Sequence, residues 1–534
     1  MPHKYKNASH EYDESISKGI CSTNPSLSSL QEIILIYLKE LAYYLLKLKE
    51  LGANNEIIKE NIIEAISWVV TNVDYNKRQF QKLIILLAQD LSQSKKIYTK
   101  LCHRNDSTPT FLKSYFSHSN NYELPEIIKR GEKYFINRNE SHTLEQKNLF
   151  DIMLFLIKNT CVEIIKIISY KKDYENAYDA ILNLLNAMNF EETTQNAEKS
   201  LIGTGTHEYY NIVKRLSDAQ EETYGKRESV YVSFTPRKGK AILVSGIDIT
   251  QLEAVLKATK DRGIDVYTHG MIMLMAHTLP KFSKYPNLIG HFGKSYDNNL
   301  LDFAAFPGAI LMTRYLFQKV DYLCRGRLFT ADSFAPSGIV KINENNFEPL
   351  IQAALESKGF TKEKPEITLR VGFREELLEA KVEELVEKIR KKEIKNIYFI
   401  GILHHENEYQ KYFDKFIKIM PKDAYAISLA HERQGENILH IDSFYDYLLI
   451  YKFLEKFSEK ESLEKLNITI FVTKCDQYTI TNVINFVNMG VGHIFLCKCL
   501  PTTVNPSLIT TMQKLFGINQ FFTPEEDLAK TLSE

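Results

Sequence analysis

The hydrophobic pattern of this chain changes at about Tyr231. Before that point, apolar residues recur with the period of an α-helix, as in the stripe from Leu30 to Leu48 that ends at Gly52. After it, short β-branched runs such as 241–244 alternate with stretches of helical period, which is typical of parallel sheets flanked by helices. We therefore expect an α + α/β protein, with an amino-terminal helical bundle followed by Rossmann-like domains.

The expected domain boundaries follow from this change of pattern. A length of 534 residues exceeds one hydrophobic core and predicts roughly three to four domains. We place a helical bundle at 1–230, an α/β domain at 231–374 and a second α/β domain at 375–534. A polar segment at Asn137–Ser141 is expected to separate two helices, and Asp248 is expected to cap another. Further strands are expected at 265–267, 309–312, 396–400, 424–429, 468–472 and 493–496.

Charge and cysteine content exclude several classes of partner and location. Lys+Arg and Asp+Glu are both 67, so no net charge favours nucleic acid or an anionic membrane. The polar amino terminus predicts no signal peptide, and charged residues interrupt the apolar stretch 149–170, which therefore reads as a buried helix. The seven cysteines, an odd number without a secretory signal, indicate a cytoplasmic protein with mostly free thiols.

Three segments carry a resemblance to a known family. They are Asp265–Gly270 with Ala276 and His277 behind it, Lys238–Gly246 followed by Asp248, and Phe306–Thr313. Together they resemble the hybrid-cluster (prismane, hydroxylamine reductase) proteins, relatives of the carbon monoxide dehydrogenases, and weaker similarity extends over essentially the whole chain. The resemblance implies a helical domain and two α/β domains that face each other across a cavity holding an iron–sulfur cluster.

The positions that would hold the hybrid cluster are mostly apolar in this chain. The resemblance matches histidine, glutamate and cysteine ligands of the family to Ile247, Met271 (or Ile272, after a one-residue insertion), Leu316, Leu403, His431, Phe444 and Asp476. Isoleucine, leucine and phenylalanine have no donor atom for iron, and methionine binds only soft metals weakly. A second, conventional cluster would need about four thiolates, of which only Cys21 remains near the amino terminus.

Large apolar residues at these positions suggest that the cavity is filled to native packing density and that the cofactor has been lost. We therefore predict a pseudoenzyme without iron–sulfur clusters, which acts by binding or scaffolding as a homodimer, or beside an intact family member or another redox protein.

Two enzymatic alternatives stay open. One is a single Fe or Zn held by His431 and Asp476 with Glu432 and His405. The other is a residual oxidoreductase of the hydroxylamine reductase type, also able to reduce nitric oxide, although that chemistry belongs to the cluster. His269 and His277 match family residues that are not ligands, and we expect them to hydrogen-bond the backbone at strand ends.

Overall fold

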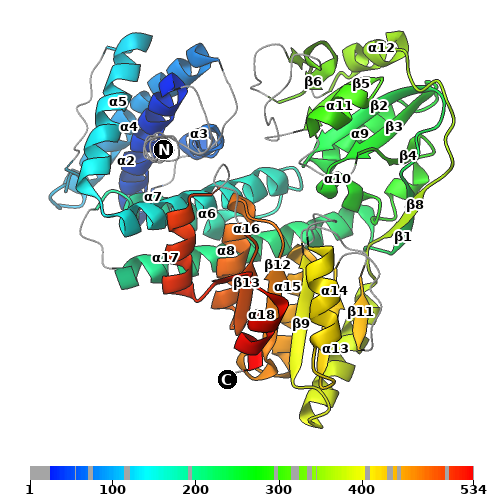
Figure 1. Ribbon diagram of the computed structural model, residues 1–534. Coiled ribbons are helices and arrows are strands. Elements are labelled where there is room, and N and C mark those ends of the chain that lie inside the picture. Colours follow the sequence, from blue (N-terminus) through cyan, green and yellow to red (C-terminus); the bar gives the residue numbers. More distant parts are fainter. Residues whose placement is uncertain are drawn as a thin grey trace, which may run out of the picture. The chain divides into compact units, whose positions relative to one another are not determined.

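The computed structural model (Figure 1) describes residues 25–53, 56–69, 76–113, 121–190, 195–293, 299–313, 324–332, 339–343, 345–402, 409–429, 437–441, 447–498 and 504–532. The chain divides into two compact units. Unit 1 comprises Met1–Arg215, Cys475–Asn488 and Cys499–Gly517. Unit 2 comprises Leu216–Lys474, Met489–Lys498 and Ile518–Glu534. The three-domain division at 230 and 374 stays a prediction.

Unit 1 is a helical bundle, as the sequence predicts. Its long helix α2 packs against α4, α5 and α7, and Gly52 ends α2 with a positive φ of 75°. Later segments of the chain, α16 and α17, pack on α6. The helices are α2 (Pro25–Glu50), α3 (Glu56–Trp68), α4 (Lys77–Arg104), α5 (Leu124–Ser141), α6 (Leu144–Ile168), α7 (Glu175–Ala187), α8 (Gln195–Tyr224, whose last turns belong to unit 2), α16 (Gln477–Asn488) and α17 (Pro506–Phe516).

The predicted break at Asn137–Ser141 is wrong, because α5 continues through Ser141. The boundary lies two residues later, at Thr143. The Thr143 side chain accepts a hydrogen bond from the backbone N–H of Gln146, and the Gln146 side chain accepts one from the N–H of Thr143. This reciprocal capping box starts α6, so the position of the cap decides where the new helix begins.

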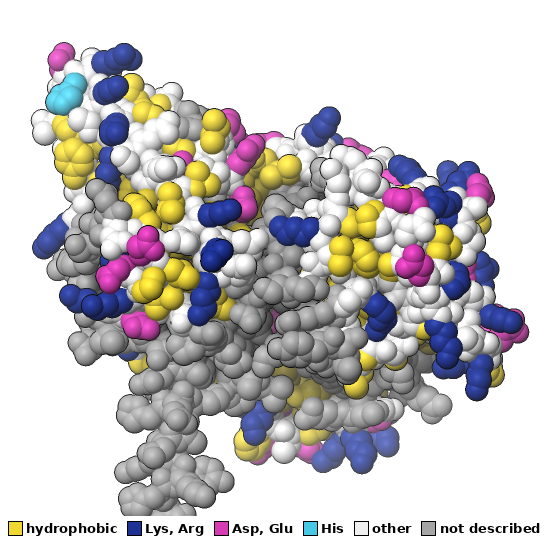
Figure 2. Space-filling model, turned by 90° about the horizontal axis from the view of Figure 1, so that it is seen from above, with side chains coloured by type: hydrophobic (Ala, Val, Ile, Leu, Met, Phe, Trp, Pro, Cys, Tyr) yellow, Lys and Arg dark blue, Asp and Glu magenta, His cyan; other side chains and the backbone are white. Residues whose placement is uncertain are grey.

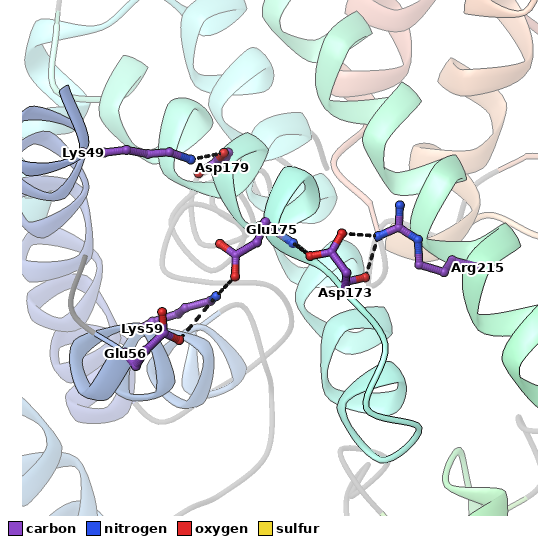
Figure 3. A network of polar contacts seen from close by, with 7 residues as sticks. All are labelled: Lys49, Glu56, Lys59, Asp173, Glu175, Asp179 and Arg215. Atoms are coloured by element: carbon purple, nitrogen blue, oxygen red, sulfur yellow. Dashed lines mark hydrogen bonds and ion pairs between the residues drawn. The ribbon is translucent and has the colours of Figure 1, made fainter. Parts of the chain in front are cut away.

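A network of ion pairs joins α7 to the helices around it in unit 1 (Figure 3). Lys59 of α3, whose side chain is 7% exposed, pairs with Glu175 of α7 and lies 4.4 Å from the ring centroid of Tyr174. Lys49 of α2 pairs with Asp179, and Arg215 of α8 donates to Asp173 at 2.9 Å. The buried ammonium of Lys59 thus has the anionic and aromatic partners that a charge needs when it leaves water.

The first sheet of unit 2 is parallel throughout and has the strand order β4-β3-β2-β5-β6-β7. After β2, the chain places β3 and β4 on one side of β2, and it then returns to place β5 on the other side. The strands are β2 (Lys240–Gly246), β3 (Ile264–His269), β4 (Leu288–His291), β5 (Ala309–Thr313), β6 (Leu328–Thr330) and β7 (Val340–Lys341), with helices α9 (Ile249–Ala258), α10 (Met271–Ala276), α11 (Asn299–Ala305) and α12 (Glu348–Glu356). The carboxyl ends of β2, β3 and β5 therefore meet where the strand order reverses.

The second sheet of unit 2 repeats this topology with the order β11-β10-β9-β12-β13-β14, again parallel. An aromatic core around Phe471 fills one of its faces. The strands are β9 (Asn396–Ile402), β10 (Ala424–Ser428), β11 (Ile438–His440), β12 (Ile468–Val472), β13 (His493–Leu496) and β14 (Asn519–Gln520), with helices α13 (Glu375–Arg390), α14 (Gln410–Ile419), α15 (Tyr447–Lys460) and α18 (Pro524–Leu532). The predicted fold class, helices followed by parallel α/β sheets, is confirmed.

A two-stranded antiparallel ribbon, β1 (Val230–Ser233) with β8 (Thr368–Val371), forms a sheet of its own, and β1 packs against β4 of the first sheet. Short 3₁₀ turns lie at Phe282–Lys284, Arg325–Arg327 and Leu463–Leu466. Within the described ranges, no helix is long and apolar enough to cross a membrane. Basic and acidic side chains both occur across the face seen in Figure 2, in keeping with the equal numbers in the sequence.

Candidate functional site

The polar residues of the first sheet gather at the carboxyl ends of β2, β3 and β4. Ser245 lies next to last in β2, His269 ends β3 and His291 ends β4. All three are buried, with exposed fractions of 1%, 1% and 2%. Buried polar groups at the edge where α/β proteins place their chemistry make this the candidate site in the described part of the chain.

A hydrogen-bonded chain runs from Ser245 through His269 to α11. The Oγ of Ser245 lies 2.9 Å from Nδ1 of His269, and Nε2 of the same ring lies 3.3 Å from Oδ2 of Asp302. Gly293, with a φ of 93°, permits this approach, because a Cβ there would lie 2.5 Å from the Asp302 carboxylate. The chain fixes the orientation of the His269 imidazole from both sides.

These residue types occur in nucleophilic hydrolases, but the surroundings do not fit that chemistry. Ser245 is shielded from solvent. The backbone N–H groups that could stabilise an oxyanion beside it are engaged, because Ile247 donates to the Thr313 carbonyl at 3.4 Å and Asp248 donates to Thr313 Oγ1 at 3.1 Å. The arrangement is therefore a positioning network rather than an acyl-transfer site.

Thr268 connects two more histidines to the network. Its Oγ1 lies 2.9 Å from Nε2 of His277 and 2.9 Å from Nδ1 of His291. The hydroxyl has one hydrogen, so at least one of the two rings must donate to it. Burial lowers the pKa of His277 to about 4 and holds the pKa of His291 well below its ordinary value, with a further contribution from the neighbouring rings. Both imidazoles are thus neutral at physiological pH.

The expected roles of His269 and His277 were wrong in one respect. Both rings bond to side-chain partners, Ser245, Asp302 and Thr268, rather than to the backbone. The partners of His269 lie 24 and 33 residues away in sequence, and only the parallel register of β2 with β3 brings Ser245 opposite His269. The spacing of Ser245 and His269 in the sequence does not predict this contact. Their positions at the ends of two strands predict only that both lie at the carboxyl edge of the sheet.

Two of the predicted ligand positions lie in this region and are buried. Ile247, 5% exposed, follows Gly246 at the end of β2, and Met271, 6% exposed, begins α10. Met271 packs in an apolar cluster with Val232, Leu274 and Val371. Isoleucine has no donor atom, and the methionine is part of the hydrophobic core, so neither position fits ligation of an iron–sulfur cluster.

Of the other predicted positions, Asp476 lies among the residues that the structure describes, and the rest lie outside them. Asp476 precedes α16, and its Oδ1 accepts the backbone N–H of Thr479 at 2.8 Å, as a carboxylate at a helix amino terminus does. Among the described residues, no group of three His, Cys, Asp or Glu side chains could hold a metal ion. Outside the described residues lie Cys21, Leu316, Leu403, His405, His431, Glu432 and Phe444.

The two neutral histidines predict a loss of stability at mildly acidic pH. In the unfolded chain their pKa returns to about 6.5, so below that pH the unfolded state binds protons that the folded state excludes. The titration of His277 should therefore lower the free energy of unfolding by about 1–3 kcal/mol between pH 6.5 and 4, and that of His291 should lower it further. Urea unfolding at a series of pH values measures this slope.

The matched variants are His277→Gln with His291→Gln, and His103→Gln on the exposed end of α4. The double variant should flatten the pH dependence, because glutamine keeps a hydrogen-bonding side chain but does not titrate. The His103 variant should leave the slope unchanged. A pH slope that is equally steep in all three proteins would contradict the assignment.

Comparison with known proteins gives a consistent result. A model of the Prismane/CO dehydrogenase family matches residues 11–430. A hydroxylamine reductase from Acidiphilium cryptum is 26% identical, with 97% of this chain and 95% of the relative covered. One from Methanocella arvoryzae is 25% identical, with 96% of each covered. Among solved structures, carbon monoxide dehydrogenase from Thermococcus sp. AM4 is similar with a TM-score of 0.49 at 11% identity, over 97% of this chain and 91% of that one.

Proposed function

This chain belongs to the Prismane/CO dehydrogenase family, and we propose that it is a non-catalytic member that assembles no iron–sulfur cluster and acts by binding or scaffolding. The observation that carries the proposal is the turn after β2. Gly246 keeps a positive φ of 121°, and Asp248 caps α9 by accepting the N–H of Thr250 at 2.9 Å. Between them stands Ile247, which has no donor atom.

This combination supports a selective loss of the cofactor. The frame of the turn needs a glycine with positive φ and a capping carboxylate, and both residues are present. The residue that differs is Ile247, the one between them, whose side chain this turn would direct toward a cluster. Burial of Ile247 and Met271 supports the view that apolar packing has taken the place of the ligands.

Metal analysis of protein purified without oxygen tests the proposal. We expect iron and acid-labile sulfide at background level and no visible absorption, because a cluster needs thiolate ligands that these positions lack. A family member with the full ligand set, purified in parallel, controls for loss of clusters during handling. Iron and sulfide near stoichiometry would contradict the proposal and favour a reductase.

A third result would favour the alternative metal site. One equivalent of zinc or iron without sulfide would point to His431, Asp476, Glu432 and His405. In that case His431→Ala should abolish binding of the metal. The contact of Asp476 with the N–H of Thr479 supports a capping role for this carboxylate, which makes the alternative the weaker proposal.

The proposal includes a cytoplasmic location and a protein partner. Cys102, Cys161, Cys324 and Cys497 are buried and form no disulfide, in keeping with this location, whereas the disulfide bond of Cys475 argues against it. A second copy, an intact family member or another redox protein is the kind of partner that a scaffold of this family would bind.

A further inference from the structure

Two basic segments lie side by side at the amino-terminal end of β2. An isolated antiparallel bridge joins Gly239, just before β2, to Phe360, which follows α12. Gly239 donates its N–H to the carbonyl of Phe360 at 3.0 Å, and Phe360 donates to the carbonyl of Gly239 at 2.8 Å. A Cβ at Gly359 would lie 2.3 Å from the carbonyl oxygen of Gly239, so the two backbones are in contact. The bridge therefore places 237–240 next to 357–364.

These two segments are strongly basic in a chain that has no net charge. They contain a single carboxylate, Glu363, and six basic residues, which are Arg237, Lys238, Lys240, Lys358, Lys362 and Lys364. Because the charges of the whole chain balance, this is a local concentration of positive charge, and its field acts over a short range.

Two of the six basic side chains are engaged within the protein. Arg237 donates to the Asp265 carboxylate through Nε at 2.7 Å and through Nη2 at 2.6 Å. Lys240 donates to the carbonyl of Ser357. These contacts fix the two segments against β3 and against each other, and they leave four lysines as the free charges of the surface.

The basic patch consists of these four lysines, Lys238, Lys358, Lys362 and Lys364. All four are exposed, and none of them forms an ion pair with any residue that the structure describes. Elsewhere in unit 2, by contrast, Lys381, Lys388 and Lys391 each pair with a glutamate three or four residues away. The charge of the basic patch is thus not neutralised by the protein and is available to an anionic partner.

Nucleic acid and lipid fit the basic patch poorly. The one aromatic side chain of the two segments, Phe360, packs against the rings of Phe306 and Tyr267, with centroids 5.4 and 5.7 Å away, and cannot stack on a base. The guanidinium fork that would grip a phosphate is occupied by Asp265. Within 237–240 and 357–364, all of which the structure describes, no large apolar side chain is exposed to anchor in a bilayer.

An acidic protein surface has the chemistry that these lysines match. The lysine ammonium is a hydrated point charge on a flexible stem, so it attracts carboxylates without demanding one geometry. Complementary charge of this kind mainly speeds association and selects the partner. We propose that the basic patch is the docking surface for an acidic surface of another protein. The proposal deepens the binding role proposed above by naming the chemistry of the partner, and it does not depend on whether the chain holds a cluster.

Fluorescence anisotropy of a labelled polyglutamate peptide, titrated with the purified chain at low ionic strength, tests the proposal. The native chain should bind the peptide, and added salt should weaken the complex because exposed charges are screened. Replacing all four lysines of the basic patch by glutamine should raise the dissociation constant at least about tenfold. An unchanged circular dichroism spectrum and thermal midpoint would show that this variant is folded.

The matched control replaces four exposed lysines of unit 1 by glutamine, namely Lys96, Lys100, Lys129 and Lys133. It changes the net charge by the same amount, so its dissociation constant should stay within about twofold of the native value.

An equal loss of binding in the two variants, or a native chain that does not bind polyglutamate, would overturn the proposal. So would tighter binding of a DNA duplex or of phosphatidylserine vesicles through the same lysines, because the partner would then be a nucleic acid or a membrane. Metal content enters none of these results, so a failure here is distinguishable from a failure of the proposed function.

Discussion

Replacing Gly246 by alanine should destabilise the first sheet of unit 2 by more than about 4 kcal/mol. The residue has a φ of 121°, a conformation that side-chain-bearing residues rarely adopt. A Cβ at this position would lie 1.9 Å from the carbonyl oxygen of Thr313 and 2.4 Å from its Oγ1. The clash falls on the two acceptors that hold the N–H groups of Ile247 and Asp248, so it would break the connection between β2 and β5.

The matched control is Gly263→Ala. Gly263 also has a positive φ, 67°, but no atom lies within 4 Å of a Cβ built there. This variant should cost only about 1–2 kcal/mol, the conformational penalty alone. Urea unfolding followed by circular dichroism measures both, and the fluorescence of Trp68, the one tryptophan of the chain, reports separately on α3 in unit 1. Equal losses in the two variants would contradict the steric argument.

Replacing Phe471 by alanine should lower the free energy of unfolding by about 4 kcal/mol. Phe471 lies in β12 with no exposed surface, at the centre of the aromatic core of the second sheet. Its ring centroid lies 4.9 Å from that of Phe416 and 4.9 Å from that of Phe495. Removing the ring would leave a cavity in contact with both sheet and helix, which the surrounding side chains can fill only partly.

Phe522→Ala is the control for this prediction. Phe522 is 71% exposed, so the same substitution should change the free energy of unfolding by less than about 0.5 kcal/mol. Urea midpoints of the two variants, compared with the native chain, give the difference. A Phe471 variant as stable as the Phe522 variant would mean that this core does not hold the second sheet together.

The short elements show the limit of prediction from the sequence. The strands with long β-branched runs, such as β2 and β12, were predicted within one or two residues, and Asp248 was predicted correctly as an N-cap. β4, β6, β7, β11 and β14 have two to four residues each and were missed, whereas β13, also four residues long, was predicted from its apolar run at 494–496. β1 and β8, with four residues each, were missed as well.

The sequence by itself determined the class of fold, and it predicted which residues stand at the ligand positions. Hydrophobic periodicity is local, and it separates bundle helices from sheet strands without knowledge of contacts. Isoleucine, leucine and phenylalanine lack donor atoms for iron in any structure, so the prediction that no cluster binds at these positions rests on side-chain chemistry alone.

Only the tertiary structure decided the partners of the buried histidines. Thr268 bonds to His277 and His291 because β3, β4 and α10 converge at one edge, and these contacts depend on parallel register between strands distant in the chain.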